Sequence, residues 1–221
     1  EISGMKHSRG FALPVLLSIL AFSGCVSGKL EVRLEVPAQE AQASLTKGVV
    51  VVDRIVDART FQNNPEDPST PSTASDAALL TAEQKQTLVG RHWDKFKAPV
   101  CELVLPKGET VNDWMFALLS EGFARRGYLV KREGPGEIHA EVRIDRFWGY
   151  SSCVPFKKTM ESDIVCTLTL RKEGQVRTLV IMGRGLRDGQ LATSEYWQAV
   201  YRRGFRHFLK HLDESLGQAG Y

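Results

Sequence analysis

The chain has 221 residues, of which 43% are hydrophobic and 25% are charged. These values are ordinary for a globular protein, and they exclude a disordered chain, a collagen and a membrane protein with several spans. The net charge of +3 is far below the concentrated basic character of a dedicated nucleic-acid binder, so no nucleic acid is expected as a partner.

The first 24 residues have the pattern of a secretory signal peptide. Met5–Gly10 is short and basic, and the run 11–22 that follows is almost wholly apolar. This run is shorter than the roughly 20 apolar residues that a membrane-spanning helix needs, and Pro14 interrupts it. We therefore expect residues 1–24 to be an export signal. Glu1–Gly4 precede the first methionine and are expected to be non-native or misannotated residues.

The segment before Cys25 resembles the lipobox of bacterial lipoproteins. It reads Leu-Ala-Phe-Ser-Gly-Cys over Leu20–Cys25, with Phe22 where Leu is usual. In that family the cysteine thiol receives a diacylglycerol, the preceding peptide is removed and the new amine is acylated. The resemblance implies palmitate-type lipidation of Cys25, and each buried CH₂ of such a chain contributes about 0.8 kcal/mol to membrane binding. An ordinary cleaved signal with a chance cysteine is the alternative.

The residues after Cys25 indicate where such a lipoprotein would reside. Val26 and Ser27 replace the Asp that marks inner-membrane retention in enteric bacteria. By this resemblance we expect a lipid anchor in the outer membrane of a Gram-negative bacterium, on the periplasmic face, with the inner membrane as the alternative.

Three further cysteines would lie in the oxidising periplasm. Cys153 and Cys166 fall on segments that we expect to be neighbouring antiparallel strands, so a disulfide between them is one hypothesis. Three buried thiols, with Cys101 as the third, are the alternative. The chain has no spacing of Cys and His that indicates zinc, and no metal or cofactor is expected.

The first part of the exported chain predicts strands around a long polar loop. Residues 25–44 are expected to be a lipidated tether that contains a first, alternating strand, and 45–221 to be a single domain. Gly48–Asp57 is a continuous β-branched run, which is typical of a central strand covered on both faces. Phe61–Ala78 is rich in Asn, Pro, Ser and Thr, and it predicts a long loop of the kind that is often functional.

The second part of the chain predicts two helices separated by an antiparallel meander. Thr110 and Asp113 resemble a capping box, and Gly127 suits the position after a helix. The expected elements, in order, are a short helix within 79–89, a strand at 101–105, a helix at 111–126, strands at 128–130, 138–148, 164–170 and 176–186, and a last helix from about 195 to 216.

This order predicts an α+β fold with a mixed or antiparallel sheet and two main helices packed on one face. The meander from Ile138 to Leu186 argues against a doubly wound nucleotide-binding fold. Gly183–Gly185 is not followed by the start of a helix, so we interpret it as a bulge rather than a phosphate-binding loop.

Several features between about Gly48 and Leu216 together follow the pattern of one protein family. They are the strand closed by Asp57–Arg59 and Phe61, the Pro/Ser loop, Val89–Arg91 with Asp94 and Phe96, the helix begun by Val111, Ala124–Tyr128, the strand end Phe147–Trp148, and the helix that contains Trp197. In these features the chain resembles the YajG-like lipoproteins of Gram-negative bacteria. No catalytic residues are established for that family, so the resemblance implies an envelope location and an α+β architecture and carries over no active site.

Two groups of titratable residues were considered as catalytic or metal-binding sites. His207 and His211 are four residues apart on the last helix, but Phe208 stands where a metalloprotease has its Glu, so a solvated helix face is favoured. Asp53, Arg54, Asp57 and Arg59 are expected to form a carboxylate–guanidinium network at the root of the long loop, because no base or nucleophile accompanies them.

Two surfaces are candidates for partner binding. Phe61 and the aromatic strand end Phe147, Trp148 and Tyr150 could present a platform for a peptide or a glycan, with core packing under the loop as the alternative. Arg202, Arg203, Arg206 and Lys210 could contact anionic lipid headgroups, or they could complement the helix dipole.

These observations predict a membrane-anchored periplasmic lipoprotein without catalytic activity, which binds another envelope protein or a lipid or glycan component. The alternatives are an accessory subunit of an envelope lipid or ABC transport system and, less favoured, a metal-dependent hydrolase that uses His207 and His211 or the Asp53 and Asp57 cluster.

Overall fold

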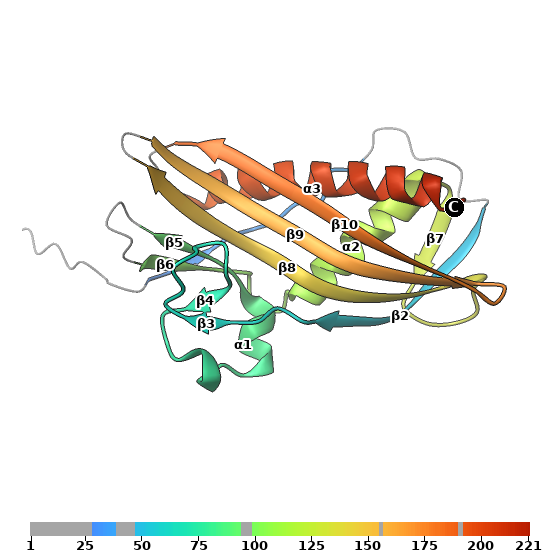
Figure 1. Cartoon of the computed structure of the whole chain (residues 1–221), viewed down its shortest axis with the longest axis horizontal. Helices are drawn as coiled ribbons and strands as arrows, with labels where there is room; N and C mark the ends of the chain where they lie inside the picture. Colours follow the sequence, from blue (N-terminus) through green and yellow to red (C-terminus); the bar gives the residue numbers. More distant parts are fainter. Residues whose placement is uncertain (1–27, 39–46, 94–98, 155–156, 190–191) are drawn as a thin grey trace, which may run out of the picture.

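The computed structural model describes residues 28–38, 47–93, 99–154, 157–189 and 192–221. In chain order its elements are β1 (Gly28–Glu31), β2 (Gly48–Asp57), β3 (Gln62–Asn63), β4 (Ser72–Thr73), the 3₁₀ turn η1 (Ala77–Leu79), α1 (Ala82–Thr87), β5 (Leu88–Trp93), β6 (Pro99–Val104), α2 (Val111–Arg125), β7 (Tyr128–Lys131), β8 (Ile138–Val154), β9 (Lys157–Lys172), β10 (Gln175–Asp188) and α3 (Ser194–Gln218) (Figure 1). No helix among these residues is long and apolar enough to cross a membrane.

One eight-stranded mixed sheet organises the domain. Strands β1, β6, β5, β8, β2 and β7 are neighbours in that order, while β9 pairs with β8 and β10 pairs with β9. The long strands β8, β9 and β10 form the predicted antiparallel meander, whereas β2 runs parallel to both β7 and β8. The predicted α+β class with a mixed sheet is therefore confirmed.

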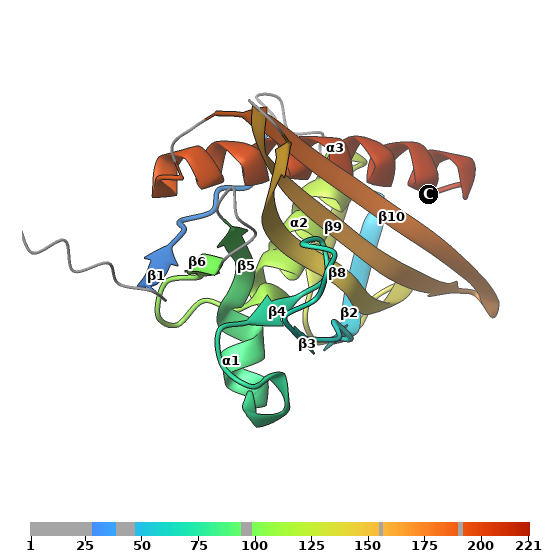
Figure 2. The same cartoon turned by 60° about the vertical axis from the view of Figure 1, so that its left-hand side comes forward.

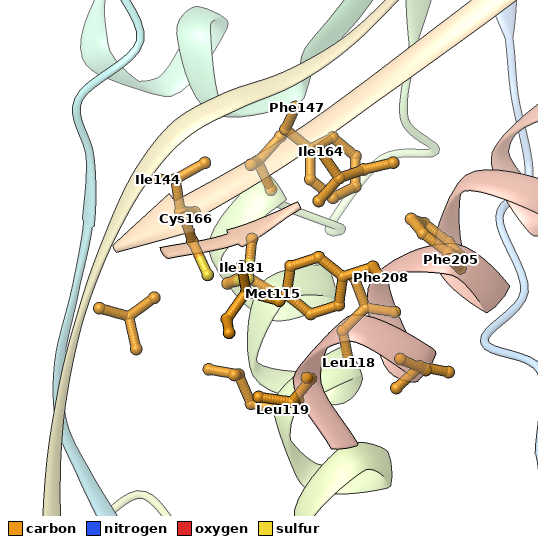
Figure 3. Close-up of a cluster of buried hydrophobic side chains, with 14 of the residues drawn as sticks. Met115, Leu118, Leu119, Ile144, Phe147, Ile164, Cys166, Ile181, Phe205 and Phe208 are labelled. Carbon is orange, nitrogen blue, oxygen red and sulfur yellow. The ribbon is translucent and has the colours of Figure 1, made fainter. Parts of the chain in front are cut away.

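Helices α2 and α3 cover one face of this sheet, as predicted (Figures 1 and 2). The hydroxyl of Thr110 accepts a hydrogen bond from the backbone N–H of Asp113 at 3.1 Å, and Gly127 has a φ of +88° directly after the helix, so both ends of α2 follow the sequence signals. The core between helices and sheet includes side chains from α2, β8, β9, β10 and α3, which Figure 3 shows: Met115, Leu118, Leu119, Ile144, Phe147, Ile164, Cys166, Ile181, Phe205 and Phe208.

Helix α3 approaches β10 closely because three glycines leave room for its backbone. A Cβ atom on Gly183 would lie 2.4 Å from the carbonyl oxygen of Gly204, and one on Gly185 would lie 2.1 Å from that of Val200. The pairing of β9 with β10 proceeds without a register shift through this region. The expectation of a bulge at Gly183–Gly185 is therefore wrong, and these glycines serve helix–sheet contact instead.

The described part of the predicted tether belongs to the domain. Strand β1 pairs in parallel with β6, and the backbone N–H of Val32 donates to the carbonyl of Val104 at 2.8 Å. Val32 is fully buried, and Arg125 donates to the carbonyl of Pro37 at 2.7 Å. The first strand is thus confirmed, whereas the free tether expected here is wrong for residues 28–37, because their apolar side chains are needed in the core.

The disulfide hypothesis does not fit the strand register. Cys166 is a free, fully buried thiol opposite Ile144 on β8, whereas Cys153 lies opposite Lys158. The two cysteines are therefore about nine positions apart along the pair of strands, roughly 30 Å at 3.3 Å per residue, while a disulfide joins Cα atoms about 4.4–6.8 Å apart. The pairing is wrong, and Cys101 is also a free thiol. The lipidation candidate, Cys25, lies outside the described residues.

Candidate functional site

The root of the long loop is held by a buried arginine. Arg59 follows β2 and forms two parallel bonds with the carboxylate of Asp57, each 2.8 Å long. Its guanidinium also donates to the backbone carbonyls of Leu88 and Phe147 at 2.8 and 2.9 Å. This part of the predicted network is confirmed. A buried cation with this many acceptors fixes the loop, β5 and β8 relative to one another.

The other two members of the predicted network lie apart from it. Asp53 contacts the ring of His139 instead, at 2.9 Å, on the sheet face opposite the helices. Arg54 has no ion pair among the described residues. The structure therefore does not bring Asp53 and Asp57 together as a catalytic carboxylate pair.

The predicted aromatic platform is buried. Trp148 and Tyr150 form a small second core with Leu88, and Phe61 packs against it with its ring edge-on to Trp148 at 5.9 Å. The indole N–H of Trp148 donates to the carbonyl of Pro68, in the long loop, at 3.2 Å. The loop thus covers these rings, and core packing was the correct alternative.

Phe147 is also buried, but on the other face of the sheet. It lies in the main core, where its ring stacks on Tyr201 at 5.8 Å and tilts against Phe205 at 5.9 Å. Its alternation with Trp148 places adjacent aromatic residues in two different cores. The partner-binding prediction for Phe147, Trp148 and Tyr150 is therefore wrong, and Phe61 is only partly exposed.

A cluster of acidic groups, which the sequence analysis missed, lies on the sheet face opposite the helices. Glu161 and Asp163 alternate on β9, and the hydroxyl of Tyr150 lies 3.1 Å from a carboxylate oxygen of Glu161 and 3.3 Å from one of Asp163. Arg184 of β10 donates to Glu161 at 3.2 Å, and Ser152 of β8 donates to the other oxygen at 3.1 Å. The spacing of two residues in Glu-Ser-Asp was the available signal, but it required knowing the strand register.

Burial dominates the electrostatics of this cluster. It raises the pKa of Asp163 above its ordinary value of 3.8, although Arg184 and Arg146 oppose this shift. Burial, together with the two neighbouring carboxylates, also raises the pKa of Tyr150. Each acidic side chain has a hydroxyl or guanidinium partner, so the cluster braces β8, β9 and β10 across the sheet rather than presenting a free base.

His207 and His211 contact the edge of the sheet. The Nδ1 atom of His211 accepts a hydrogen bond from the backbone N–H of Met182 at 3.0 Å, and that of His207 accepts one from Arg184 at 3.2 Å. An imidazole that accepts through Nδ1 carries its proton on Nε2, so neither ring presents a lone pair there to a metal. The described residues also contain no group of three or more metal-ligating side chains.

A shallow hollow of about 220 Å³ lies beside these histidines. It is also lined by Met182, Lys210 and Glu214, and the last two form an ion pair at 3.8 Å. The hollow contains neither Asp53 nor Asp57, so it does not assemble the residues of the proposed hydrolase. The histidines instead satisfy backbone donors of β10.

The remaining length of β10 is an open edge. Among the described strands β10 pairs with β9 alone, and successive residues point their backbone groups to alternate sides. The backbone N–H groups of Met182 and Arg184 point away from β9. Because the direction alternates along the strand, the backbone groups of Val176, Thr178 and Val180 also point away from β9. No hydrogen bond within the described chain covers those three. Val176 and Val180 are 57% and 53% exposed.

This open half therefore combines unpaired backbone groups with exposed β-branched side chains. Unprotected edges of this kind are templates for another strand, and proteins usually shield them. The sequence predicted Val176–Leu186 only as a strand that pairs back onto its neighbour. Its position at the sheet edge has no local sequence signal, because it depends on which strands pair elsewhere.

Comparisons with known proteins leave the family open. No family model matches the sequence, and no curated protein matches it. Among solved structures, the chain is similar to an uncharacterized protein, with 12% identity over 86% of this chain and 97% of that one and a TM-score of 0.44. It is also similar to protein XCC0632 from Xanthomonas campestris, described under the family name DUF330, with 11% identity over 87% of this chain and 94% of that one and a TM-score of 0.42.

Proposed function

We propose that this protein is a membrane-anchored lipoprotein of the bacterial envelope, on the periplasmic side, that acts without catalysis by binding an extended segment of another envelope protein. The export signal and Cys25 support the anchored location. The observation that carries the binding role is the open half of β10, where Val176, Thr178 and Val180 offer both backbone groups and side chains.

Strand addition is the mode of recognition that this surface favours. A partner strand laid beside β10 would take up the outward N–H and C=O groups, and its side chains would contact Val176 and Val180. Each cross-strand contact between β-branched side chains contributes roughly 0.2–1 kcal/mol. The contact surface that we propose is therefore on β10, since the aromatic residues of β8 are buried.

A photocrosslinker at Val180, in the full chain within the native envelope, tests this proposal. We expect an adduct that is lost when Thr178→Pro is added. Proline removes only the outward N–H of that residue, so the pairing with β9 is retained. Thr178→Val is the matched control, because it keeps the N–H, and its adduct should persist.

A crosslinker at Leu79, an exposed apolar residue at the end of η1, provides a second control. An adduct from Leu79 in place of Val180, or one that is indifferent to Thr178→Pro, would overturn the binding mode. An adduct with an ABC permease component would favour the accessory-subunit alternative among envelope partners.

The anchored location has its own test. Cys25→Ser should abolish palmitate labelling and release the protein from membrane fractions. Continued labelling of this variant would contradict the lipobox interpretation without affecting the result at Val180.

A further inference from the structure

The start of β1 limits how far the folded domain can stand from an anchor on Cys25. Gly28 is paired with Cys101 of β6, so its position in the sheet is fixed. Gly28 is three positions along the chain from Cys25, and an extended chain spans at most about 3.6 Å per residue. The Cα atom of Cys25 therefore lies within about 11 Å of that of Gly28, whatever path the chain takes.

Several elements meet at this end of the sheet. Trp93 at the end of β5 bonds to Ser151 of β8 through its backbone N–H at 2.8 Å, and the hydroxyl of Ser194 at the start of α3 donates to the carbonyl of Glu31 at 2.6 Å. Figure 1 shows β5 and β6 at one end of the long axis and the turn between β9 and β10 at the other, and Figure 2 places β1 beside β6. We call this the β1 end.

The opposite end lies far beyond the reach of the anchor. Strand β9 has 16 residues and spans roughly 50 Å at about 3.3 Å per residue. It connects the β1 end to the turn at Glu173 and Gly174. A lipid held within about 11 Å of Gly28 therefore constrains one end of the domain and leaves the other end free.

The β1 end offers groups suited to a lipid surface. Lys29 is exposed on β1, and Val100, the second residue of β6, is 40% exposed despite being apolar. A lysine near an anionic membrane contributes about 1 kcal/mol, and an apolar side chain gains by entering the headgroup boundary. These contributions are small beside that of the anchor, so the short connection from Cys25 to Gly28 does most to hold the β1 end at the surface.

We propose that the β1 end, with Lys29 and Val100, rests against the phospholipid surface that holds the acyl chains of Cys25, and that the β9–β10 turn points away from it. The inference rests on the proposed lipidation. Its partner is a lipid surface, because an acylated Cys25 would keep this end of the domain within a few residues of the membrane. It places the open half of β10 away from the membrane, where a partner strand can reach it.

A competing orientation would lay α3 along the membrane. Its exposed face is basic at Arg202, Arg203, Arg206 and Lys210, and anionic lipid would attract it. The two orientations predict different protected lysines. Lys29 marks the β1 end, Lys210 marks the exposed flank of α3, and Lys131 at the end of β7 marks the far end.

Acetylation footprinting distinguishes these orientations without altering the lysines. The acylated full chain, in vesicles of phosphatidylethanolamine and phosphatidylglycerol, is compared with the soluble Cys25→Ser form by mass spectrometry. Of the three marker lysines, we expect only Lys29 to lose acetylation. Protection of Lys210, or equal labelling of all three lysines in both forms, would overturn the proposal.

Depth-dependent quenching gives an independent measurement. Single fluorophore-labelled cysteines at Val100, Arg206 and Glu173, in an acylated chain whose other thiols are replaced, should be quenched by headgroup nitroxide lipids most strongly at Val100 and least at Glu173. A chain that carries no acyl group and does not bind vesicles contradicts the proposed anchoring itself. A chain that is acylated and bound, but quenched most at Arg206 or Glu173, contradicts only the orientation.

Discussion

The two halves of β10 are treated differently by the rest of the molecule. Between Met182 and Leu186 the strand is closed by α3, whose histidines accept from the backbone and whose Arg203 donates to the carbonyl of Leu186. Between Val176 and Val180 the same strand has no such cover among the described residues. One half of β10 therefore joins α3 to the sheet, and the other half presents an open edge. The two halves differ because the side chains of α3 reach only the first of them, and not because their residues differ in strand propensity.

The comparison also shows how a protein limits an exposed edge. The closed half has glycines that admit the helix backbone, so the side chains of α3 can reach over the edge. The open half has Val, Thr and Val on its outward positions, which would suit a sheet interior equally well. Charged side chains are the common way to block the addition of another strand to a sheet edge. If the open half of β10 had to be blocked in this way, charged residues would be expected at these three positions.

The largest expected effect comes from breaking the closed half with Gly185→Ala. The new Cβ would clash with the carbonyl oxygen of Val200 and the backbone nitrogen of Gly204, because it would lie closer to both than a van der Waals contact allows. Both are backbone atoms, so they cannot turn aside as a flexible side chain could. We expect a loss of about 3 kcal/mol in the free energy of unfolding, at the upper end of overpacking costs. Urea denaturation measures it, and Thr178→Ala in the open half is the control. Equal costs for the two variants would remove the distinction between the halves.

A smaller effect is expected when the cover is removed by His207→Ala with His211→Ala. Two backbone donors lose their acceptors, at about 1 kcal/mol each, and the open edge extends to Arg184. Sedimentation should then detect increased self-association. Arg206→Ala with Lys210→Ala, on the same face of α3, is the matched control and should leave the protein unassociated. Association of the control instead would mean that charge, and not the hydrogen bonds, protects the edge.

Val180→Lys should change the stability of the protein little, although it should strongly alter the binding surface of the open half. The side chain is already half exposed, so the free energy of unfolding should stay within about 0.5 kcal/mol of the parent value. A charge at this position should nevertheless prevent crosslinking from Val176. Ile181→Lys, one residue further and fully buried against the helices, should destabilise the protein far more than Val180→Lys. A stable Ile181→Lys variant would contradict the assigned faces of β10.

The smallest effect concerns the pH dependence contributed by Asp163, beside the boundary between the halves. Its pKa is raised in the folded state, so its contribution to stability is full below the ordinary value of 3.8 and is lost as the pH rises through the raised value. Asp163→Asn should therefore gain stability relative to the parent as the pH rises through this range.

Glu141→Gln provides a control of opposite sign for that measurement. The hydrogen bond and charge of Arg171 lower the pKa of Glu141, so its contribution is present at neutral pH and is lost on acidification. This variant should lose stability relative to the parent as the pH rises. Unfolding titrations between pH 3 and 7 compare the two, and slopes of the same sign would contradict the assigned environments.

Local signals in the sequence predicted much of the fold. Thr110 and Gly127 mark the ends of α2 by capping chemistry that acts within a few residues, and alternation located the long strands. The pairing of Asp57 with Arg59 was also predictable, because the two residues are only two positions apart. Each of these features is decided by atoms that are close in sequence.

The errors have one physical source, which is the register and order of strands. The burial of Trp148 and Phe147 on opposite faces, the separation of Cys153 from Cys166 and the edge position of β10 all depend on how β8 is placed between β2, β5 and β9. A register shift between Ile144 and Arg146 changes which residues of β8 face the helices. The sequence of a single strand does not contain that information, so the candidate site could not be located from it.

The parallel pairing of β1 with β6 has a consequence for the order of assembly. Gly28 meets Cys101, a partner that emerges much later from any machinery that delivers the chain from its N-terminus. Contacts between such distant residues form late, because the intervening chain must first be brought to order. Strand β1 must therefore wait for β5 and β6, which makes its docking onto β6 a natural endpoint of folding.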